Sequence, residues 1–332
     1  MTKLPNLYPL AFQTIFKDKI WGGSKIHTIL GKDFSPLPNC GETWEISGVE
    51  GNISVVKEGP LAGKTLTELI ETYQGDLVGD SVYQKFGTEF PLLVKFIDAN
   101  ADLSIQVHPD DELAAQRHNS FGKTEMWYIF QADEGSSLIT GFNQSLNKET
   151  YLEYFNSGRL MDILNQEPVS PGDVYFLPAG RVHTIGKGLL LAEIQQTSDI
   201  TYRIYDFNRK DADGNTRELH VEEALDAIDY NFYEEYKTQY DSRENEAVTI
   251  VESPYFSTQR IQANEAVSRD YSEIDSFVIY VCVDGALTLT DNHGHESEMK
   301  LGDAFLLPAA IDGVELKPVN GGEFTVLEAW VP

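Results

Sequence analysis

The sequence predicts a mainly β protein made of two similar β units, each of them a sandwich or a barrel. A chain of 332 residues is long for a single core, since domains typically contain roughly 100–200 residues. From residue 90 onward, short apolar runs alternate with Pro, Gly, Asp and Asn. This spacing is typical of a sandwich or barrel rather than of alternating strands and helices. An eight-residue segment also occurs twice, which indicates a repeated architecture.

Helices are expected before and between the strands. Residues 66–88 show helical spacing of apolar side chains interrupted by Gly75 and Gly79, which predicts two short helices. Residues 109–117 begin with Pro and carry acidic side chains in the first turn, as helix N-termini do. Residues 147–165 form another helical pattern. Strands are expected at 91–99, 103–108, 125–131, 174–179, 182–185, 189–196 and 201–207.

The repeated segment distinguishes the two units. Residues 172–179 (GDVYFLPA) are echoed by residues 302–309 (GDAFLLPA), and eleven residues after the first Gly the two copies carry His183 and Gly313. Only the first copy keeps a side chain able to bind a metal, so we expect the first unit to be active and the second structural.

A charged, Tyr-rich stretch at residues 229–246 marks the expected domain boundary. It places a catalytic domain, with an N-terminal arm and helical insertions, at residues 1–244. A degenerate C-terminal β domain is expected at residues 245–332.

Charge and cysteine content restrict the function and the partners. The formal net charge of −28 repels a nucleic-acid backbone and an anionic membrane, so neither is an expected partner. A small anion can bind only where Lys or Arg side chains gather. Cys40 and Cys282 are too few for a disulfide framework, and the N-terminal residues lack the apolar stretch of a signal peptide. We expect a cytoplasmic monomer or homodimer with a small-molecule partner.

Polar side chains on three predicted strands suggest a metal site. Alternation along a strand puts Ser104, Gln106 and His108 on one face. Glu125 begins the next strand, and His183 lies in a third. Two imidazoles and one carboxylate suit Zn²⁺ with a position open for water or substrate, and Gln106 could add a neutral oxygen.

Each of these residues also has an ordinary structural explanation. His108 could precede a helix, Glu125 could be a solvated strand end, and His183 could be a hydrogen-bonded turn residue. The three together are better explained by a metal, because a small barrel can bring them to one point. The competing pair His293 and His295 lies in a stretch with the composition of a hairpin turn.

Several motifs extend this pattern over residues 20 to 210. They are WGG at 21–23, GETWEIS at 41–47, PLLVKF at 91–96, SIQVHPDD at 104–111, GKTEMW at 122–127, PAGRVH at 178–183 and the segment 193–203. Together they resemble the type I mannose-6-phosphate isomerases, which are proteins of cupin-type (jelly-roll) β-barrels. With only sixteen residues between His108 and Glu125 and no large helical insertion domain, the chain resembles the short bacterial form.

The resemblance implies a ligand set and a substrate pocket. One zinc ion per chain would be bound by Gln106, His108, Glu125 and His183. The residues implied around the substrate are Lys123, Arg203, Glu193, Lys95, Ser104, Glu42 and Trp21.

The resemblance also implies interconversion of mannose 6-phosphate and fructose 6-phosphate through an enediol, with a proton moved between C1 and C2. Alternation turns Thr201, Arg203 and Tyr205 to one face, which would let Arg203 meet negative charge, and Lys123 would share a face with Glu125. The sequence does not decide which group is the catalytic base; the candidates are Glu193, Glu42 and metal-bound water.

Two other functions fit the same residues. A cupin-type Fe(II) oxygenase also uses two His and one carboxylate as metal ligands. A non-catalytic sugar-phosphate-binding homologue would agree with the degenerate second barrel. The motifs do not decide between mannose 6-phosphate and another hexose 6-phosphate.

Overall fold

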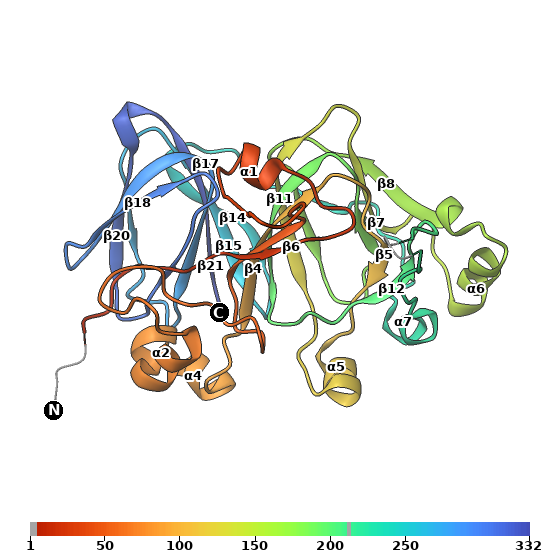
Figure 1. Ribbon diagram of the computed structural model, residues 1–332, viewed down its shortest axis with the longest axis horizontal. Helices are drawn as coiled ribbons and strands as arrows, with labels where there is room; N and C mark the ends of the chain where they lie inside the picture. Colours follow the sequence, from red (N-terminus) through yellow and green to blue (C-terminus); the bar gives the residue numbers. More distant parts are fainter. Residues whose placement is uncertain (1–4, 211–213) are drawn as a thin grey trace. The chain divides into compact units, whose positions relative to one another are not determined.

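The mainly β fold is confirmed by the computed structural model, which describes residues 5–210 and 214–332 (Figure 1). The chain divides into two compact units. The central unit comprises Phe16–Glu42 and Phe96–Thr238, and the C-terminal unit comprises the N-terminal stretch ending at Ile15, Thr43–Lys95 and Gln239–Pro332.

Two antiparallel sheets form most of the central unit, drawn mainly in yellow and green in Figure 1. The five-stranded sheet has the order β12 (Tyr202–Tyr205), β5 (Ile105–Val107), β10 (His183–Ile185), β7 (Ser137–Phe142), β8 (Leu164–Pro168). The other sheet begins with β13 (Lys237–Thr238), β9 (Val174–Leu177), β6 (Glu125–Ala132), β11 (Leu189–Gln196). It continues through strands whose residues are divided between the units, namely β4 (Leu92–Ala99), β3 (Glu42–Ile46), β2 (Ile15–Lys17).

The C-terminal unit contains a nine-stranded antiparallel sheet. Its main path runs β1 (Leu10–Ala11), β19 (Ala304–Leu307), β17 (Val278–Asp291), β21 (Phe324–Trp330), β15 (Ser257–Ala263), β14 (Glu246–Glu252). Off this path lie β16 (Val267–Asp270), β18 (Glu296–Lys300), β20 (Gly313–Pro318). A short 3₁₀ helix, η2 (Val319–Gly321), follows β20.

All three stretches that the sequence predicts as helical contain helices, and two further short α-helices, at residues 25–28 and 221–227, were not predicted. The central unit contains α1 (Lys25–Thr28), α5 (Asp111–His118), α6 (Lys148–Asn156), η1 (Leu160–Ile163), α7 (Val221–Ala227). The C-terminal unit contains α2 (Leu66–Tyr73), α3 (Gly75–Val78), α4 (Asp80–Phe86). None of the described helices combines the length and the apolar character that crossing a membrane requires.

Two helix predictions differ from the structure in detail. Residues 66–88 form three helices rather than two, because Gln74 and Gly79 have φ angles of 49° and 92° and end α2 and α3. Residues 147–165 do not form one helix. Gly158, at φ 73°, follows the end of α6, and the chain passes through η1 into strand β8.

Strand pairing shows how the two copies of the repeat correspond. Strands β10 and β20 both begin eleven residues after the first Gly of their copy, at His183 and Gly313. Glu125 pairs with Leu177 in the first copy, and Val278 pairs with Leu307 in the second. The position of Glu125 is therefore occupied by Val278, so the second copy lacks the counterparts of both Glu125 and His183.

Candidate metal centre

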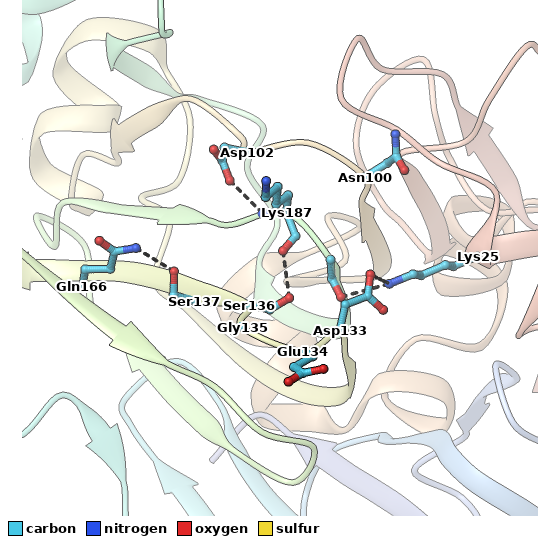
Figure 2. Close-up of a pocket in the computed structure, with 11 residues that line it drawn as sticks. Lys25, Asn100, Asp102, Asp133, Glu134, Gly135, Ser136, Ser137, Gln166 and Lys187 are labelled. Atoms are coloured by element: carbon cyan, nitrogen blue, oxygen red, sulfur yellow. Dashed lines mark hydrogen bonds and ion pairs between the residues drawn. The ribbon is translucent and has the colours of Figure 1, made fainter.

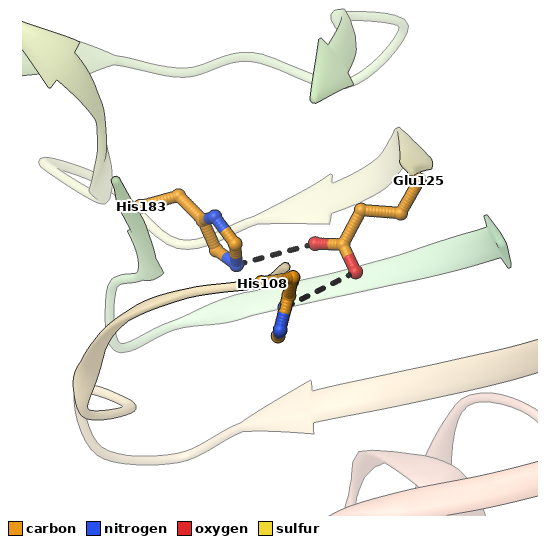
Figure 3. A group of neighbouring side chains, drawn as sticks. All are labelled: His108, Glu125 and His183. Carbon is orange, nitrogen blue, oxygen red and sulfur yellow. Dashed lines mark ion pairs between the residues drawn. The ribbon is translucent and has the colours of Figure 1, made fainter. Parts of the chain in front are cut away.

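His108, Glu125 and His183 converge in the interior of the central unit (Figure 3). Their side chains are buried, with exposed fractions of 1%, 0% and 1%. One ligand atom from each lies within 4.8 Å of the others. The Nε2 atoms of His108 and His183 lie 3.6 Å and 3.3 Å from the two Glu125 carboxylate oxygens. The sequence prediction that these three residues meet is confirmed.

Strand register explains this convergence. On the five-stranded sheet, Gln106 of β5 lies directly opposite His183 of β10 on one side and Arg203 of β12 on the other. Directly opposed residues in antiparallel strands share a face. The neighbours Ile105 and Val107 point the other way and pack in an apolar cluster with Tyr202 and Ile204. Period-two alternation therefore separates the polar face with Gln106 from a buried apolar face that packs in this cluster.

Both histidines are held in the tautomer that a metal needs. His108 Nδ1 lies 2.9 Å from the Ile200 carbonyl, and His183 Nδ1 lies 2.7 Å from the Arg181 carbonyl. A carbonyl only accepts, so each Nδ1 carries the proton and each Nε2 keeps its lone pair. Burial lowers the pKa of His183 to about 4, so this imidazole is neutral near pH 7. Two neutral imidazoles and a carboxylate are a donor set that fits a divalent transition metal.

Gln106 lies beside this group. Its amide Nε2 is 3.3 Å from His183 Nε2, and its Oε1 accepts a 3.4 Å hydrogen bond from Ser104 Oγ. The two ends of a carboxamide are interchanged by a simple rotation. That rotation would direct Oε1 to the side where His183 Nε2 lies.

Lys123 brings a positive charge to the same atoms. Its side chain is buried, and Nζ lies 3.2 Å from His108 Nε2 and 3.3 Å from a Glu125 oxygen. Lysine only donates, so the contact again identifies His108 Nε2 as an acceptor. The expected proximity of Lys123 to Glu125 is confirmed.

Glu193 is connected to the metal group, which consists of His108, Glu125 and His183, through an aromatic residue that the sequence analysis did not select. Trp127 Nε1 donates a 2.8 Å hydrogen bond to Glu193 Oε2, and the Trp127 ring meets the His183 ring edge-on at 5.3 Å. Trp127 is two residues from Glu125 on strand β6, so it lies on the same face. The two-residue spacing from Glu125 was the feature of the sequence that could have identified Trp127. A Trp at such a position, however, more often belongs to an apolar core.

Arg203 faces Gln106, but the expectation that Tyr205 shares its face is wrong. A register shift between Arg203 and Tyr205 places Tyr205 opposite Ile105. An extra residue in one strand, a β-bulge, reverses the alternation beyond it. Arg203 Nη1 donates to the Glu218 carbonyl at 2.8 Å, while Nε is buried with no hydrogen-bond partner in the described part of the chain. Burial and the neighbouring Arg217 lower the pKa of Arg203.

The other residues that the resemblance implies have contacts of their own. Ser104 is buried beside Gln106. Trp21 packs in an apolar cluster that also contains Trp127. Glu42 forms a 3.3 Å ion pair with Lys19. Lys95 is buried in the C-terminal unit, with Nζ 5.4 Å from the centre of the Trp44 ring.

The competing histidines lie elsewhere, in the turn between β17 and β18. Asp291 accepts hydrogen bonds from the backbone N–H groups of His293 and His295, and its other oxygen lies 2.7 Å from His295 Nδ1. This is the hairpin turn that the sequence predicts.

A pocket of the central unit, of about 380 Å³, lies at the far ends of the same strands (Figure 2). Glu125 begins β6, whereas Asp133 follows its last residue and lines this pocket. Asp133 forms a 3.0 Å ion pair with Lys25, and Asp102 accepts from the Lys187 backbone N–H. The pocket lining includes none of His108, Glu125 and His183, so the pocket is separate from that group.

Fold and site define a mainly β protein of the cupin class with a buried group suited to a metal. Residues 10–136 match the catalytic domain of phosphomannose isomerase type I, and residues 246–322 match the mannose-6-phosphate isomerase cupin domain. The chain is 36% identical to a mannose-6-phosphate isomerase of Streptococcus mutans, over 91% of this chain and 93% of that protein. It is 35% identical to the mannose-6-phosphate isomerase ManA of Bacillus subtilis, over 93% of this chain and 96% of that protein.

A solved mannose 6-phosphate isomerase structure is also similar to this chain over almost its whole length. The crystal structure of the mannose 6-phosphate isomerase from Bacillus subtilis superposes with a TM-score of 0.85 at 34% identity, covering 97% of this chain and 99% of that one. The chain belongs to the type I mannose-6-phosphate isomerase family.

Proposed function

We propose that this chain is a zinc-dependent aldose–ketose isomerase that interconverts mannose 6-phosphate and fructose 6-phosphate. The observation that carries the proposal is the buried group of His108, Glu125 and His183, with both Nε2 lone pairs directed at its centre. It occurs in a chain whose relatives, similar over almost their whole length, are mannose-6-phosphate isomerases. Family membership favours this activity over the Fe(II) oxygenase and the non-catalytic binding protein.

One zinc ion would be held by His108, Glu125, His183 and the amide oxygen of Gln106. The chemistry that zinc supplies when bound is Lewis-acid stabilisation of negative charge developing on the substrate oxygens. Glu125 supplies one negative charge and the other three ligands are neutral, so the site would keep a net positive charge.

Lys123 and Arg203 would hold the anionic substrate. Both side chains lie by the metal group in a chain with a net charge of −28. The spare Nε–H donor of Arg203 can bind an oxygen of the phosphate or of the enediol. Lys95, Ser104, Glu42 and Trp21 are proposed as further substrate contacts because they match family motifs.

Glu193 is our first candidate for the group that moves the proton between C1 and C2. Its carboxylate is buried, and the Trp127 indole fixes one oxygen. A fixed carboxylate near the reacting carbons is what general-base catalysis requires. Glu42 is the alternative, since it also lies in a family motif.

We further propose that residues 245–332 form the degenerate cupin domain and residues 1–244 the catalytic one. A cytoplasmic location and a monomeric or homodimeric state also stay predictions.

Metal analysis combined with a coupled assay on mannose 6-phosphate tests the function. We expect about one zinc per chain, as in catalytic sites with three or four protein ligands, and isomerase activity that His108→Ala and Arg203→Ala abolish. His108→Ala should also lose the metal, whereas Arg203→Ala should keep it. A zinc-loaded wild type without activity on mannose 6-phosphate would refute the proposal.

A further inference from the structure

Arg181 precedes the proposed ligand His183 by two residues, and its guanidinium packs against two neighbouring tyrosine rings. Its central carbon is 4.4 Å from the centre of the Tyr233 ring and 4.7 Å from that of Tyr236. The Arg181 side chain is 8% exposed, and no carboxylate of the described residues forms an ion pair with it. The two aromatic rings are therefore the main stabilising partners of a buried cation.

The Tyr236 ring is itself firmly anchored to strand β7. Its hydroxyl donates to the Phe142 carbonyl at 2.8 Å and accepts from the Phe142 N–H at 3.1 Å. The ring also covers Gly141, where a Cβ atom would come within 2.3 Å of it. Gly141 has a φ of 66°, so both its backbone conformation and this close approach require glycine.

Tyr233 packs against the same guanidinium next to Tyr236, with the two ring centres 5.9 Å apart. Its backbone N–H donates to the Tyr236 hydroxyl at 3.2 Å, and its own hydroxyl donates to Asp229 at 2.8 Å. Asp229 in turn donates its backbone N–H to the Gly180 carbonyl at 2.8 Å. The Tyr-rich stretch that the sequence suggests as a domain boundary thus packs onto the turn that leads to His183.

That turn contacts both histidines of the metal group. The Gly180 N–H donates to the His108 carbonyl at 2.9 Å, and the Arg181 carbonyl accepts from His183 Nδ1 at 2.7 Å. The Val182 carbonyl accepts from the Gly141 N–H at 2.7 Å. The position of the Arg181 backbone therefore determines the orientation of the His183 ring.

We propose that Arg181, packed against both Tyr233 and Tyr236, is a positioning residue for His183: this aromatic clamp fixes the carbonyl that orients the imidazole. The inference rests on the proposed role of His183 as a metal ligand. Residues that orient a ligand in this way typically contribute about 10- to 100-fold to metal affinity.

The test is the zinc dissociation constant, measured by competition with a chromophoric chelator, for Arg181→Met and Tyr233→Leu. Arg181→Met keeps an unbranched apolar stem but removes the charged guanidinium, and we expect affinity to fall about 10- to 100-fold. Tyr233 is 40% exposed, so Tyr233→Leu should leave the fold intact while weakening zinc binding by about tenfold. Tyr233→Phe keeps the ring and should retain most of the affinity.

The matched control is Arg159→Met. The Arg159 guanidinium also lies over a tyrosine, 4.9 Å from the centre of the Tyr154 ring, but it is at the surface. This variant should bind zinc as the wild type does. In the cobalt-substituted protein, the visible absorption bands should change for Arg181→Met and not for Arg159→Met, since these bands report ligand geometry.

The outcomes separate this inference from the proposed function. Wild-type zinc affinity and cobalt spectra in folded Tyr233→Leu and Arg181→Met would overturn the clamp alone. If Arg181→Met does not fold, Tyr233→Leu decides the question. A wild type that binds no zinc would overturn the proposed function as well.

Discussion

Trp127 and Glu193 face each other across strands β6 and β11, and the indole N–H donates a 2.8 Å hydrogen bond to the Glu193 carboxylate. The same indole touches the His183 ring. One tryptophan therefore connects a proposed metal ligand with the candidate base, and this connection makes Glu193 testable.

Glu193→Gln should lower kcat by about 100-fold or more, because an amide cannot accept the proton that a general base removes. Zinc content should stay at the wild-type level, since the substitution is nearly isosteric. Trp127→Phe, which removes the hydrogen bond to the carboxylate together with part of the buried ring, should have a smaller effect on kcat, about tenfold. Exposed Glu222→Gln is the control. Near-normal turnover by Glu193→Gln would show that Glu193 is not the base. Glu42 would then be the next carboxylate to test.

Removal of the metal should abolish activity reversibly. Dialysis against a chelator should leave an inactive protein with its β structure intact, and adding zinc should restore turnover. His183→Ala should not recover, because it lacks one of the donors. His293→Ala, altered in a turn of the C-terminal unit, should recover fully. Circular dichroism measures the β structure, metal analysis the bound zinc and the coupled assay the isomerase activity. Recovery of activity by His183→Ala would argue against its role as a ligand.

In the C-terminal unit, Glu328 is fully buried and forms an ion pair with Arg269 while accepting a 2.6 Å hydrogen bond from Tyr271. Arg269→Met leaves this carboxylate without its cation, which should reduce the free energy of unfolding by about 3–5 kcal/mol. Denaturant unfolding measures the change. Arg243→Met, which breaks exposed ion pairs with Asp241 and Glu246, should cost less than about 1 kcal/mol. Equal losses for both variants would contradict this account.

Asp206 accepts hydrogen bonds from Arg209 and Arg217. Burial alone would raise the pKa of Asp206, but these hydrogen bonds outweigh it and lower the pKa below the ordinary value. Asp206 therefore stabilises the fold above its ordinary pKa of about 3.9, and this contribution is lost as the pH falls through the lowered value. Asp206→Asn should reduce the free energy of unfolding by about 1–3 kcal/mol at neutral pH.

The acid dependence provides the check on Asp206. The difference between wild type and Asp206→Asn should shrink as the pH falls below about 4, because the Asp206 carboxyl is then protonated in the unfolded chain and, at still lower pH, in the folded protein as well. Urea unfolding at a series of pH values measures it. A difference that stays constant down to about pH 3 would show that the charge of Asp206 contributes nothing.

Local pattern alone was enough to predict much of the site. The alternation of Gln106 and His108 with Ile105 and Val107 predicted which side chains face the interior, because a strand has a period of two. The eleven-residue offset to His183 in one repeat and Gly313 in the other predicted that only one copy keeps a metal-capable residue. The activity was predicted from the family motifs, because the alternation of side chains along a strand says nothing about the reaction.

Only the tertiary structure decided the relationships that depend on register and long-range packing. A bulge after Arg203 turned Tyr205 to the opposite face, and no local pattern marks an extra residue in a strand. The Trp127–Glu193 hydrogen bond joins residues 66 positions apart. Tyr233 and Tyr236 pack against Arg181 from a stretch that composition suggested was a domain boundary. Such contacts depend on how distant strands pair and pack, whereas the sequence by itself determined which faces of those strands were polar.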